Sequence, residues 1–292
     1  MPQMPEFEEL QFRSGDVSLH TIAAGPVDGE VIILLHGFPE FWYSWRSQIG
    51  ALAEAGYRVI VPDQRGYNTS SKPAEVEAYS IRNLVSDVIA IADQLGREKI
   101  FLAGHDWGAA VAWSVAAAHP ERIHRLAILN VPHPATMARY LRTHLRQLLH
   151  SWYIMWFQIP GLPEAVIAAG DYRAGKMALT SSSRPGTFSD ADLQLYRNAW
   201  AQPGALTAMI NWYRAAFRSM LRGGIPPTRI EVPVRILWGE KDRFLLAEMA
   251  EDSLQYCAQG ELIRFPECTH WIHHEEPARV NQLLIEWFRG VR

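Results

Sequence analysis

The sequence GHDWG, residues 104–108, has the residue types of a catalytic turn. It follows the apolar run KIFLA and precedes the small-residue run AAVAWSVAAA. A sharp turn from a strand into a helix needs glycine on both sides and exposes the side chain of its central residue. That residue is Asp106, so the turn would present a carboxylate. The alternative is structural, because aspartate is also a common cap at the beginning of a helix.

Two further residues could form a catalytic triad with Asp106. Asp242 follows the apolar run RILWG, and His270 lies in the loop after the run ELIRF. Nucleophile, acid and then histidine is the chain order of triads built on such a turn. The Asp242 carboxylate would accept a hydrogen bond from one ring nitrogen of His270, and the other nitrogen would deprotonate water. The alternative is that His270 is an ordinary surface histidine.

The segment HGFPE, residues 36–40, follows the apolar run VIILL and could help to bind an oxyanion. In such a site two backbone N–H groups stabilise the negative oxygen, one from the residue after the nucleophile and one from an earlier loop. These residues are Trp107 and Phe38. We expect the peptide bond between Phe38 and Pro39 to be cis, because such a proline usually serves a fixed, unusual turn.

An aspartate at the nucleophile position changes the reaction that the site can perform. A carboxylate that attacks an ester would form a mixed anhydride that readily reverts, whereas attack on a saturated carbon gives an alkyl ester. Asp106 would therefore open a strained epoxide or displace a halide. Water activated by His270 and Asp242 would then hydrolyse the ester. The N–H groups of Phe38 and Trp107 would stabilise the oxyanion of this second step, by roughly 3 kcal/mol for each donor.

Six short apolar runs alternate with helical patterns and predict a mostly parallel sheet with helices on both faces. The runs are VIILLH (31–36), YRVIVPD (57–63), KIFLAG (99–104), RLAILN (125–130), PVRILWG (233–239) and ELIRFP (261–266). Helices are expected at about 44–55, 80–95, 108–118, 246–257 and 276–289. The segment Phe7–Ala24 could add one or two antiparallel edge strands. The fold class is α/β.

The alternation stops in a 92-residue stretch, 134–225, that has helical patterns and no convincing strand. A connection of this length needs its own structure, and over the carboxyl edge of the sheet it would form a cap. We therefore expect a core of residues 1–133 and 226–292 and a helical cap of residues 134–225. The stretch contains 10 Lys and Arg but only 4 Asp and Glu. This charge could help the cap to dock, or could simply lie on solvated helix faces.

The composition excludes several kinds of partner. The chain has 292 residues and a formal net charge of −3, which gives no electrostatic reason to bind nucleic acid or an anionic membrane. The two cysteines, Cys257 and Cys268, predict neither a zinc site nor a disulfide framework. The beginning, MPQMPEFEEL, lacks the apolar core of an export signal, and no apolar run reaches the ~18 residues of a membrane span. We expect a cytoplasmic protein.

Five motifs together resemble the epoxide hydrolases of the α/β-hydrolase fold. They are HGFPE, DQRGYNTSSKP, GHDWG, WGEKD and the histidine loop THW. The resemblance spans nearly the whole chain. It implies a cap over an α/β core, conversion of epoxides to vicinal diols through an ester on Asp106, and no cofactor. The partners would be a small apolar epoxide and water, with the chain a monomer or a homodimer.

The resemblance also implies two proton donors in the cap. Epoxide hydrolases use two cap tyrosines, and their motifs resemble the segments around Tyr153 and Tyr213, YIMWFQ and NWYR. Either tyrosine by itself could simply pack in the cap, as aromatic side chains at helical spacing usually do. The pocket would lie between cap and core. Its expected lining is His36, Pro39, Trp107, Trp156, Trp212 and Trp271.

Two alternative functions remain open from the sequence. Haloalkane dehalogenases usually carry asparagine where Phe38 stands, and fluoroacetate dehalogenases carry arginine where Trp107 stands. This chain has neither, although Trp107 itself is shared with the haloalkane enzymes. In some relatives the triad acid follows the strand before the cap, where this chain has Asn130. A receptor that retains the fold without catalysis is the second alternative.

The sequence departs from the family pattern at two positions, and it offers one set of residues as an alternative metal site. The chain reads FQIPG where the family often has glutamate after the glutamine, and Asn68 replaces a common glycine. Neither touches a proposed chemical role, although either could alter the pocket. The stretch HWIHH offers His270, His273 and His274 as ligands, but no ligand geometry supports a metal site there. We expect no metal.

Overall fold

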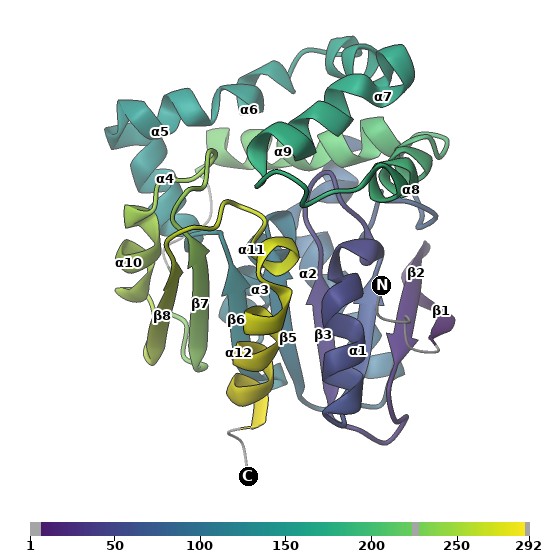
Figure 1. Cartoon of the computed structure of the whole chain (residues 1–292), viewed down its shortest axis with the longest axis vertical. Helices are drawn as coiled ribbons and strands as arrows, with labels where there is room; N and C mark the ends of the chain where they lie inside the picture. Colours follow the sequence, from purple (N-terminus) through teal and green to yellow (C-terminus); the bar gives the residue numbers. More distant parts are fainter. Residues whose placement is uncertain (1–6, 224–227, 290–292) are drawn as a thin grey trace.

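A computed structural model describes residues 7–223 and 228–289, and its centre is an eight-stranded sheet (Figure 1). The strand order is β1-β2-β4-β3-β5-β6-β7-β8. The first two strands are antiparallel to their neighbours, and all other neighbours are parallel. The strands are β1 (Glu8–Ser14), β2 (Val17–Ala24), β3 (Val31–Leu35), β4 (Arg58–Pro62), β5 (Ile100–His105), β6 (Ile123–Leu129), β7 (Val234–Gly239) and β8 (Gly260–Phe265). The six expected parallel strands and the antiparallel edge are thus confirmed.

Helices cover both faces of the sheet (Figure 1). Those of the core are α1 (Arg46–Glu54), α2 (Ile81–Gln94), α3 (Trp107–Ala118), α10 (Glu248–Leu254), α11 (Ile272–Glu275) and α12 (Pro277–Arg289). Three short 3-10 helices are Trp42–Trp45, Val76–Tyr79 and Pro120–Arg122. The five expected core helices are present, although α1 begins later than expected because a 3-10 turn precedes it.

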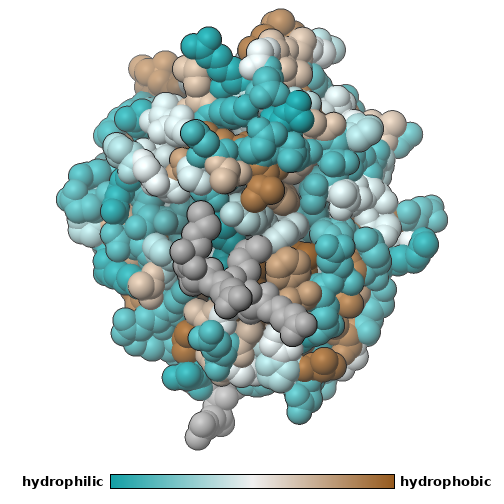
Figure 2. All heavy atoms as spheres, turned by 45° about the vertical axis from the view of Figure 1, so that its right-hand side comes forward, coloured by the Kyte–Doolittle hydropathy of each residue, from teal (hydrophilic) through white to brown (hydrophobic). Residues whose placement is uncertain are grey.

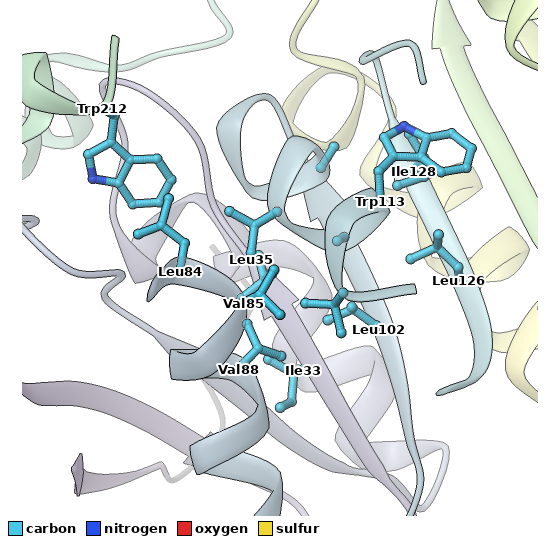
Figure 3. Close-up of a cluster of buried hydrophobic side chains, with 14 of the residues drawn as sticks. Ile33, Leu35, Leu84, Val85, Val88, Leu102, Trp113, Leu126, Ile128 and Trp212 are labelled. Carbon is cyan, nitrogen blue, oxygen red and sulfur yellow. The ribbon is translucent and has the colours of Figure 1, made fainter. Parts of the chain in front are cut away.

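Successive strand residues bury their side chains on opposite faces of the sheet, as the period of a strand requires. In β3, Ile33 and Leu35 belong to one apolar cluster and Ile32 and Leu34 to the other. Figure 3 shows the first cluster, in which Ile33 and Leu35 lie beside the α2 side chains, including Val88. Because both faces are buried, the strands read as continuous apolar runs rather than alternating ones.

Six helices lie between β6 and β7 in the chain and cover the carboxyl ends of the parallel strands (Figure 1). They are α4 (Pro134–Thr143), α5 (Leu145–His150), α6 (Trp152–Trp156), α7 (Leu162–Ser182), α8 (Asp190–Trp200) and α9 (Ala205–Leu221). We call these helices the cap. The expected boundary between residues 225 and 226 lies outside the described residues. Within the described ranges, no helix is both long and apolar enough to cross a membrane.

Candidate active site

Asp106 occupies a strained turn between β5 and α3. Its φ is 49° and its ψ is −126°, a conformation that costs a non-glycine residue free energy. Glycine is required around it, because a Cβ on Gly108 would collide with the carbonyl of Leu35 and one on Gly37 with Asp106 itself. The Asp106 side chain makes no capping hydrogen bond to α3. Helix capping is therefore not the reason for an aspartate here.

His270 lies between two carboxylates. Its Nε2 is 3.5 Å from Oδ2 of Asp106, and its Nδ1 is 2.7 Å from Oδ2 of Asp242. Burial alone would lower the pKa of His270, but the two carboxylates outweigh burial and raise it to about 10. Burial would likewise raise the pKa of Asp106, yet the hydrogen bond and positive charge of His270 lower it. The resting site thus favours a carboxylate–imidazolium–carboxylate arrangement.

Asp242 is held by four hydrogen bonds at the end of β7. Its Oδ1 accepts from the backbone N–H groups of Phe244 and Leu245, at 2.7 and 3.1 Å. Its Oδ2 accepts from Nδ2 of Asn130 at 2.8 Å in addition to His270. The Asp242 side chain is fully buried. A carboxylate with this many donors is fixed in position.

Asn130 ties the carboxyl ends of β6 and β7 together. Its Oδ1 accepts from the backbone N–H of Gly239, and its Nδ2 donates to the carbonyl of Gly239 as well as to Asp242. Its φ of 53° is unusual for a residue other than glycine, though asparagine tolerates it best. From the sequence, Asn130 marks only a position that lacks a carboxylate. The signal in the sequence that could have indicated this role is the place of Asn130 directly after the last strand before the cap.

The oxyanion donors lie beside Asp106. The backbone N–H of Phe38 donates to Oδ1 of Asp106 at 2.6 Å. Trp107 is the first residue of α3, so its N–H belongs to the helix-terminal groups that have no partner within the helix. The peptide bond between Phe38 and Pro39 is cis, as expected. One oxygen of Asp106 therefore already accepts a hydrogen bond from the Phe38 N–H, one of the two expected donors.

Aromatic side chains from core and cap meet over Asp106. The Tyr213 ring centroid lies 5.0 Å from that of Trp107, 5.2 Å from that of Phe38 and 5.9 Å from that of Tyr153. Tyr213 comes from α9 and Tyr153 from α6, and Phe157 packs against both. Burial, and then the negative charge of Asp106, raises the pKa of both tyrosines. Both phenols therefore remain protonated at neutral pH.

Comparison with known proteins shows the family. The family model of the alpha/beta hydrolase fold matches residues 30–277. The AB hydrolase superfamily protein YfhM of Bacillus subtilis is 47% identical over 274 residues, 94% of this chain and 95% of that protein. Epoxide hydrolase 4 of Mus musculus is 38% identical over 281 residues, 94% of this chain and 77% of that protein.

Solved structures agree with the sequence relatives. An epoxide hydrolase from Bacillus megaterium, in complex with an inhibitor, has a TM-score of 0.87 and 30% identity and covers 97% of this chain and 100% of its own. A mutant of that enzyme holding its product, (R)-3-[1]naphthyloxy-propane-1,2-diol, has a TM-score of 0.87 at 30% identity, over 96% of this chain and 100% of its own. The chain belongs to the epoxide hydrolases of the α/β-hydrolase family. The resemblance seen in the sequence is confirmed.

The expected pocket residues of this epoxide hydrolase are not equally placed to meet a substrate. Trp107, Pro39 and Trp156 are partly exposed. His36 is fully buried, and the backbone N–H of Gln64 donates to its Nε2. His36 is therefore not a lining residue, and that expectation is wrong, because Gln64 and Tyr67 of the core enclose its ring.

Trp212 and Trp271 also have almost no free surface in the hydrolase. The indole N–H of Trp212 donates to the carbonyl of Arg65, and that of Trp271 donates to Oγ of Ser182. Both bonds run between core and cap, since Trp212 and Ser182 lie on cap helices. These tryptophans fix the cap on the core and support the aromatic residues in front of them.

A buried polar cluster lies behind His270. The Nε2 of His105 lies 2.9 Å from the carbonyl oxygen of His270, and its Nδ1 is 3.1 Å from Oε2 of Glu40. The Oε1 of Glu40 lies 2.7 Å from Nε2 of His274 and accepts from the hydroxyl of Tyr196 in α8. Burial would raise the pKa of Glu40, but the neighbouring histidines hold it well below its usual value. The cluster joins the His270 loop to the cap.

The sequence analysis missed the role of Glu40, although it lies in the HGFPE motif. Among the described residues, three potential metal ligands come together only in Glu40, His105 and His273, with ligand atoms within 4.8 Å of one another. These residues are not the set of His270, His273 and His274 that the sequence offers as ligands. Glu40 accepts a hydrogen bond from Tyr196 and lies within hydrogen-bonding distance of His105 and His274.

Proposed function

We propose that the enzyme converts small apolar epoxides to vicinal diols, with Asp106 as the nucleophile and with water as the second reactant. The observation that carries the proposal is the position of Asp106. Its carboxylate is 20% exposed, touches the triad histidine on one side and faces two protonated cap tyrosines on the other. The product bound to the Bacillus megaterium mutant is itself a 1,2-diol. No cofactor takes part in this scheme.

The first step forms an ester. Oδ1 of Asp106 accepts the hydrogen bond of the Phe38 N–H, so Oδ2 is the oxygen that attacks an epoxide carbon. The carbon–oxygen bond of the epoxide breaks, and the departing oxygen takes a proton from Tyr153 or Tyr213. Oδ1 becomes the carbonyl oxygen of the ester. It lies in the oxyanion site from the beginning of the reaction, which removes the need to reorganise the donors later.

The second step hydrolyses the ester. Conversion of Asp106 to a neutral ester removes one of the two charges that raise the pKa of His270. His270 then gives up its proton, which restores the tyrosine hydroxyl, and becomes a base. It takes a proton from water as the hydroxide adds to the ester carbonyl. The tetrahedral intermediate collapses to the diol and the Asp106 carboxylate, and His270 is again the imidazolium. Asp242 stays charged throughout.

An isotope experiment tests the scheme directly. In a single turnover in ¹⁸O-labelled water, the oxygen added to the substrate comes from Asp106, so the first diol should be unlabelled. The label should appear in the carboxylate of the peptide that carries Asp106. Labelled diol in that first turnover would mean that water attacks the epoxide directly, and the ester mechanism would be abandoned.

The substrate class is tested by presenting styrene oxide and a 1-bromoalkane to the same preparation. An opening epoxide needs a proton donor, whereas a departing bromide does not. We expect diol from the epoxide and no bromide from the alkane. Bromide release without diol would identify a dehalogenase. If neither product is released, the receptor alternative is favoured. A panel of further epoxides would then be assayed to check that result.

The two steps should respond differently to pH. The pKa of Asp106 is lowered and those of the tyrosines are raised. Ester formation should therefore be constant between about pH 6 and about pH 9. Ester hydrolysis needs neutral His270, so it should slow as the pH falls through the histidine's pKa in the ester. Stopped-flow tryptophan fluorescence in single turnovers separates the two rates. If the rates of both steps fall together as the pH is lowered, the assignment of His270 as the base of the second step is contradicted.

Asn130 should act on hydrolysis through Asp242. In Asn130→Ala the carboxylate loses one hydrogen bond and Gly239 loses two. We expect ester hydrolysis to slow by about tenfold, the equivalent of one lost buried hydrogen bond, with ester formation little changed. The exposed Asn198→Ala serves as the control. Equal slowing of both steps would show that the substitution disturbs the whole site rather than the triad.

A further inference from the structure

The outer side of the cap exposes an unusual number of large apolar side chains. Within each helix, members stand three or four residues apart, the spacing that places side chains on one face: Leu145 and Leu149 in α5, Trp152 and Met155 in α6, and Leu162 and Val166 in α7. Leu145 and Leu149 are 70% and 63% exposed, and Trp152 is 62% exposed. The full set is Leu145, Leu148, Leu149, Trp152, Met155, Ile159, Leu162 and Val166. We call it the outer cap face. Isolated exposed leucines are ordinary, but a continuous set marks a binding surface.

The outer cap face lies on the side of the cap away from the sheet. Its helices, α5, α6 and the beginning of α7, follow one another across the top of the molecule (Figure 1). In Figure 2, separate hydrophobic patches lie at the upper edge of the molecule, with hydrophilic residues between them. The same helix α6 turns Tyr153 inward, toward Asp106. Helix α6 therefore contributes both to the outer cap face and to the aromatic cluster of the site.

The unpaired charges of this face are positive, because its one acidic residue, Glu164, is paired with Arg214. No aspartate or glutamate occurs anywhere in residues 134–163, which contain Arg139, Arg142 and Arg146. Arg139 pairs with Asp252. Arg142 and Arg146 are exposed, and neither forms an ion pair with any residue that the structure describes. Two unneutralised cations thus border an apolar surface, the combination found in helices that lie in a lipid headgroup layer.

We propose that the outer cap face binds the surface of an anionic lipid bilayer. Leu145, Leu149 and Trp152 would enter the boundary between headgroups and acyl chains, while Arg142 and Arg146 would contact lipid phosphates. The net charge of −3 led us to expect no membrane partner, but that total averages a basic cap with an acidic core. A bilayer also dissolves apolar molecules, so binding would hold the pocket next to a concentrated supply of the substrates proposed above.

A second copy of the chain fits this face less well. Pairing two outer cap faces would bring four unneutralised arginines together, because the acidic residues of the same helices, Glu164 and Asp171, are already paired with other basic side chains. Like charges that are brought together in an apolar interface cost free energy. An anionic bilayer instead supplies both the apolar layer and the opposite charge.

Vesicle flotation tests the proposal. The full-length protein is mixed with vesicles of phosphatidylcholine alone, or of phosphatidylcholine with phosphatidylglycerol. We expect binding to the anionic vesicles, little binding to neutral ones, and a loss of binding at high salt. Arg142→Gln/Arg146→Gln and Leu145→Ser/Leu149→Ser should each weaken binding by about tenfold or more. Both double variants should keep the wild-type rate on a water-soluble epoxide without vesicles, which shows that they are folded.

The matched controls lie on other parts of the surface. Val27→Ser removes an equally exposed apolar side chain, and Arg13→Gln removes an exposed cation, both from the core. These variants should bind as the wild type does. No flotation with anionic vesicles, or equal binding by all variants, overturns the proposal. If light scattering instead finds a dimer that Leu145→Ser/Leu149→Ser dissociates, the face joins two copies of the chain, which also overturns it. Epoxide turnover is measured separately, so failure here leaves the proposed reaction intact.

Discussion

His270→Gln should react once with an epoxide and then stop. Asp106 can still attack, because the substitution leaves the nucleophile and the cap tyrosines in place. Without a base the ester is not hydrolysed, so steady-state turnover should fall by about a hundredfold to ten-thousandfold. Intact-protein mass spectrometry should show a stable adduct with the mass of one substrate molecule. Peptide mapping should locate it on the peptide that contains Asp106.

The control for this experiment is Asp106→Asn, alone and combined with His270→Gln. Neither protein should gain mass from the epoxide, because an amide is a poor nucleophile. An adduct that persists without the Asp106 carboxylate would place the ester elsewhere. Undiminished turnover in His270→Gln would remove the histidine from the mechanism. Glutamine keeps much of the bulk of histidine, which limits the loss of packing against Trp271.

Tyr153→Phe/Tyr213→Phe should block the step that His270→Gln leaves intact. Both hydroxyl groups lie in the aromatic cluster above Asp106, and burial keeps them protonated. Without them the departing alkoxide has no acid, so ester formation should fall by about a hundredfold to ten-thousandfold. Each single variant should lose less, because the other tyrosine still donates. The measured quantity is the rate of the burst in a single turnover.

A combined variant separates this effect from a general loss of structure. Adding His270→Gln to the tyrosine pair should abolish the mass adduct on the time scale at which His270→Gln alone forms it. Tyr256→Phe, which removes a phenol outside the cap, should keep the wild-type burst. An undiminished burst in the double tyrosine variant would show that another group protonates the leaving oxygen. The cap tyrosines would then be packing residues.

The strands and the positions of Asp106, Asp242 and His270 could be predicted because they depend on local pattern and on one rule of topology. Buried parallel strands are continuous apolar runs, and their carboxyl ends meet at one edge of the sheet. Three polar residues that each follow such a run are therefore brought together. The structure places the ring of His270 between the two carboxylates without any further assumption.

The supporting residues could not be predicted in the same way. The bond from Asn130 to Asp242 depends on β6 and β7 being neighbours in register, and these strands are separated by the whole cap. The cluster of Glu40 needs residues from the first loop, the nucleophile turn and the last loop, together with Tyr196 from the cap. His36 was misplaced because a motif gives a position in the chain but not the direction of a side chain.

The exposed outer cap face shows the same limit. A spacing of three or four residues predicts that α5 and α6 have two faces, but it does not say which face meets the core. Here both faces carry large apolar or aromatic side chains, since Tyr153 points inward and Trp152 outward. Only the packed structure shows which face contacts the core and which face is exposed.

Tyr153 and Tyr213 belong to the cap, whereas Asp106, Asp242 and His270 belong to the α/β core. In the proposed scheme, protonation of the departing oxygen thus depends on α6 and α9, while attack on the epoxide and hydrolysis of the ester depend on the loops of the sheet. Mutations in the cap can change which leaving group is accepted and leave the release chemistry as it is. The enzyme is in this sense modular, and new substrate ranges can arise by exchange of one helical insertion over an unaltered catalytic base.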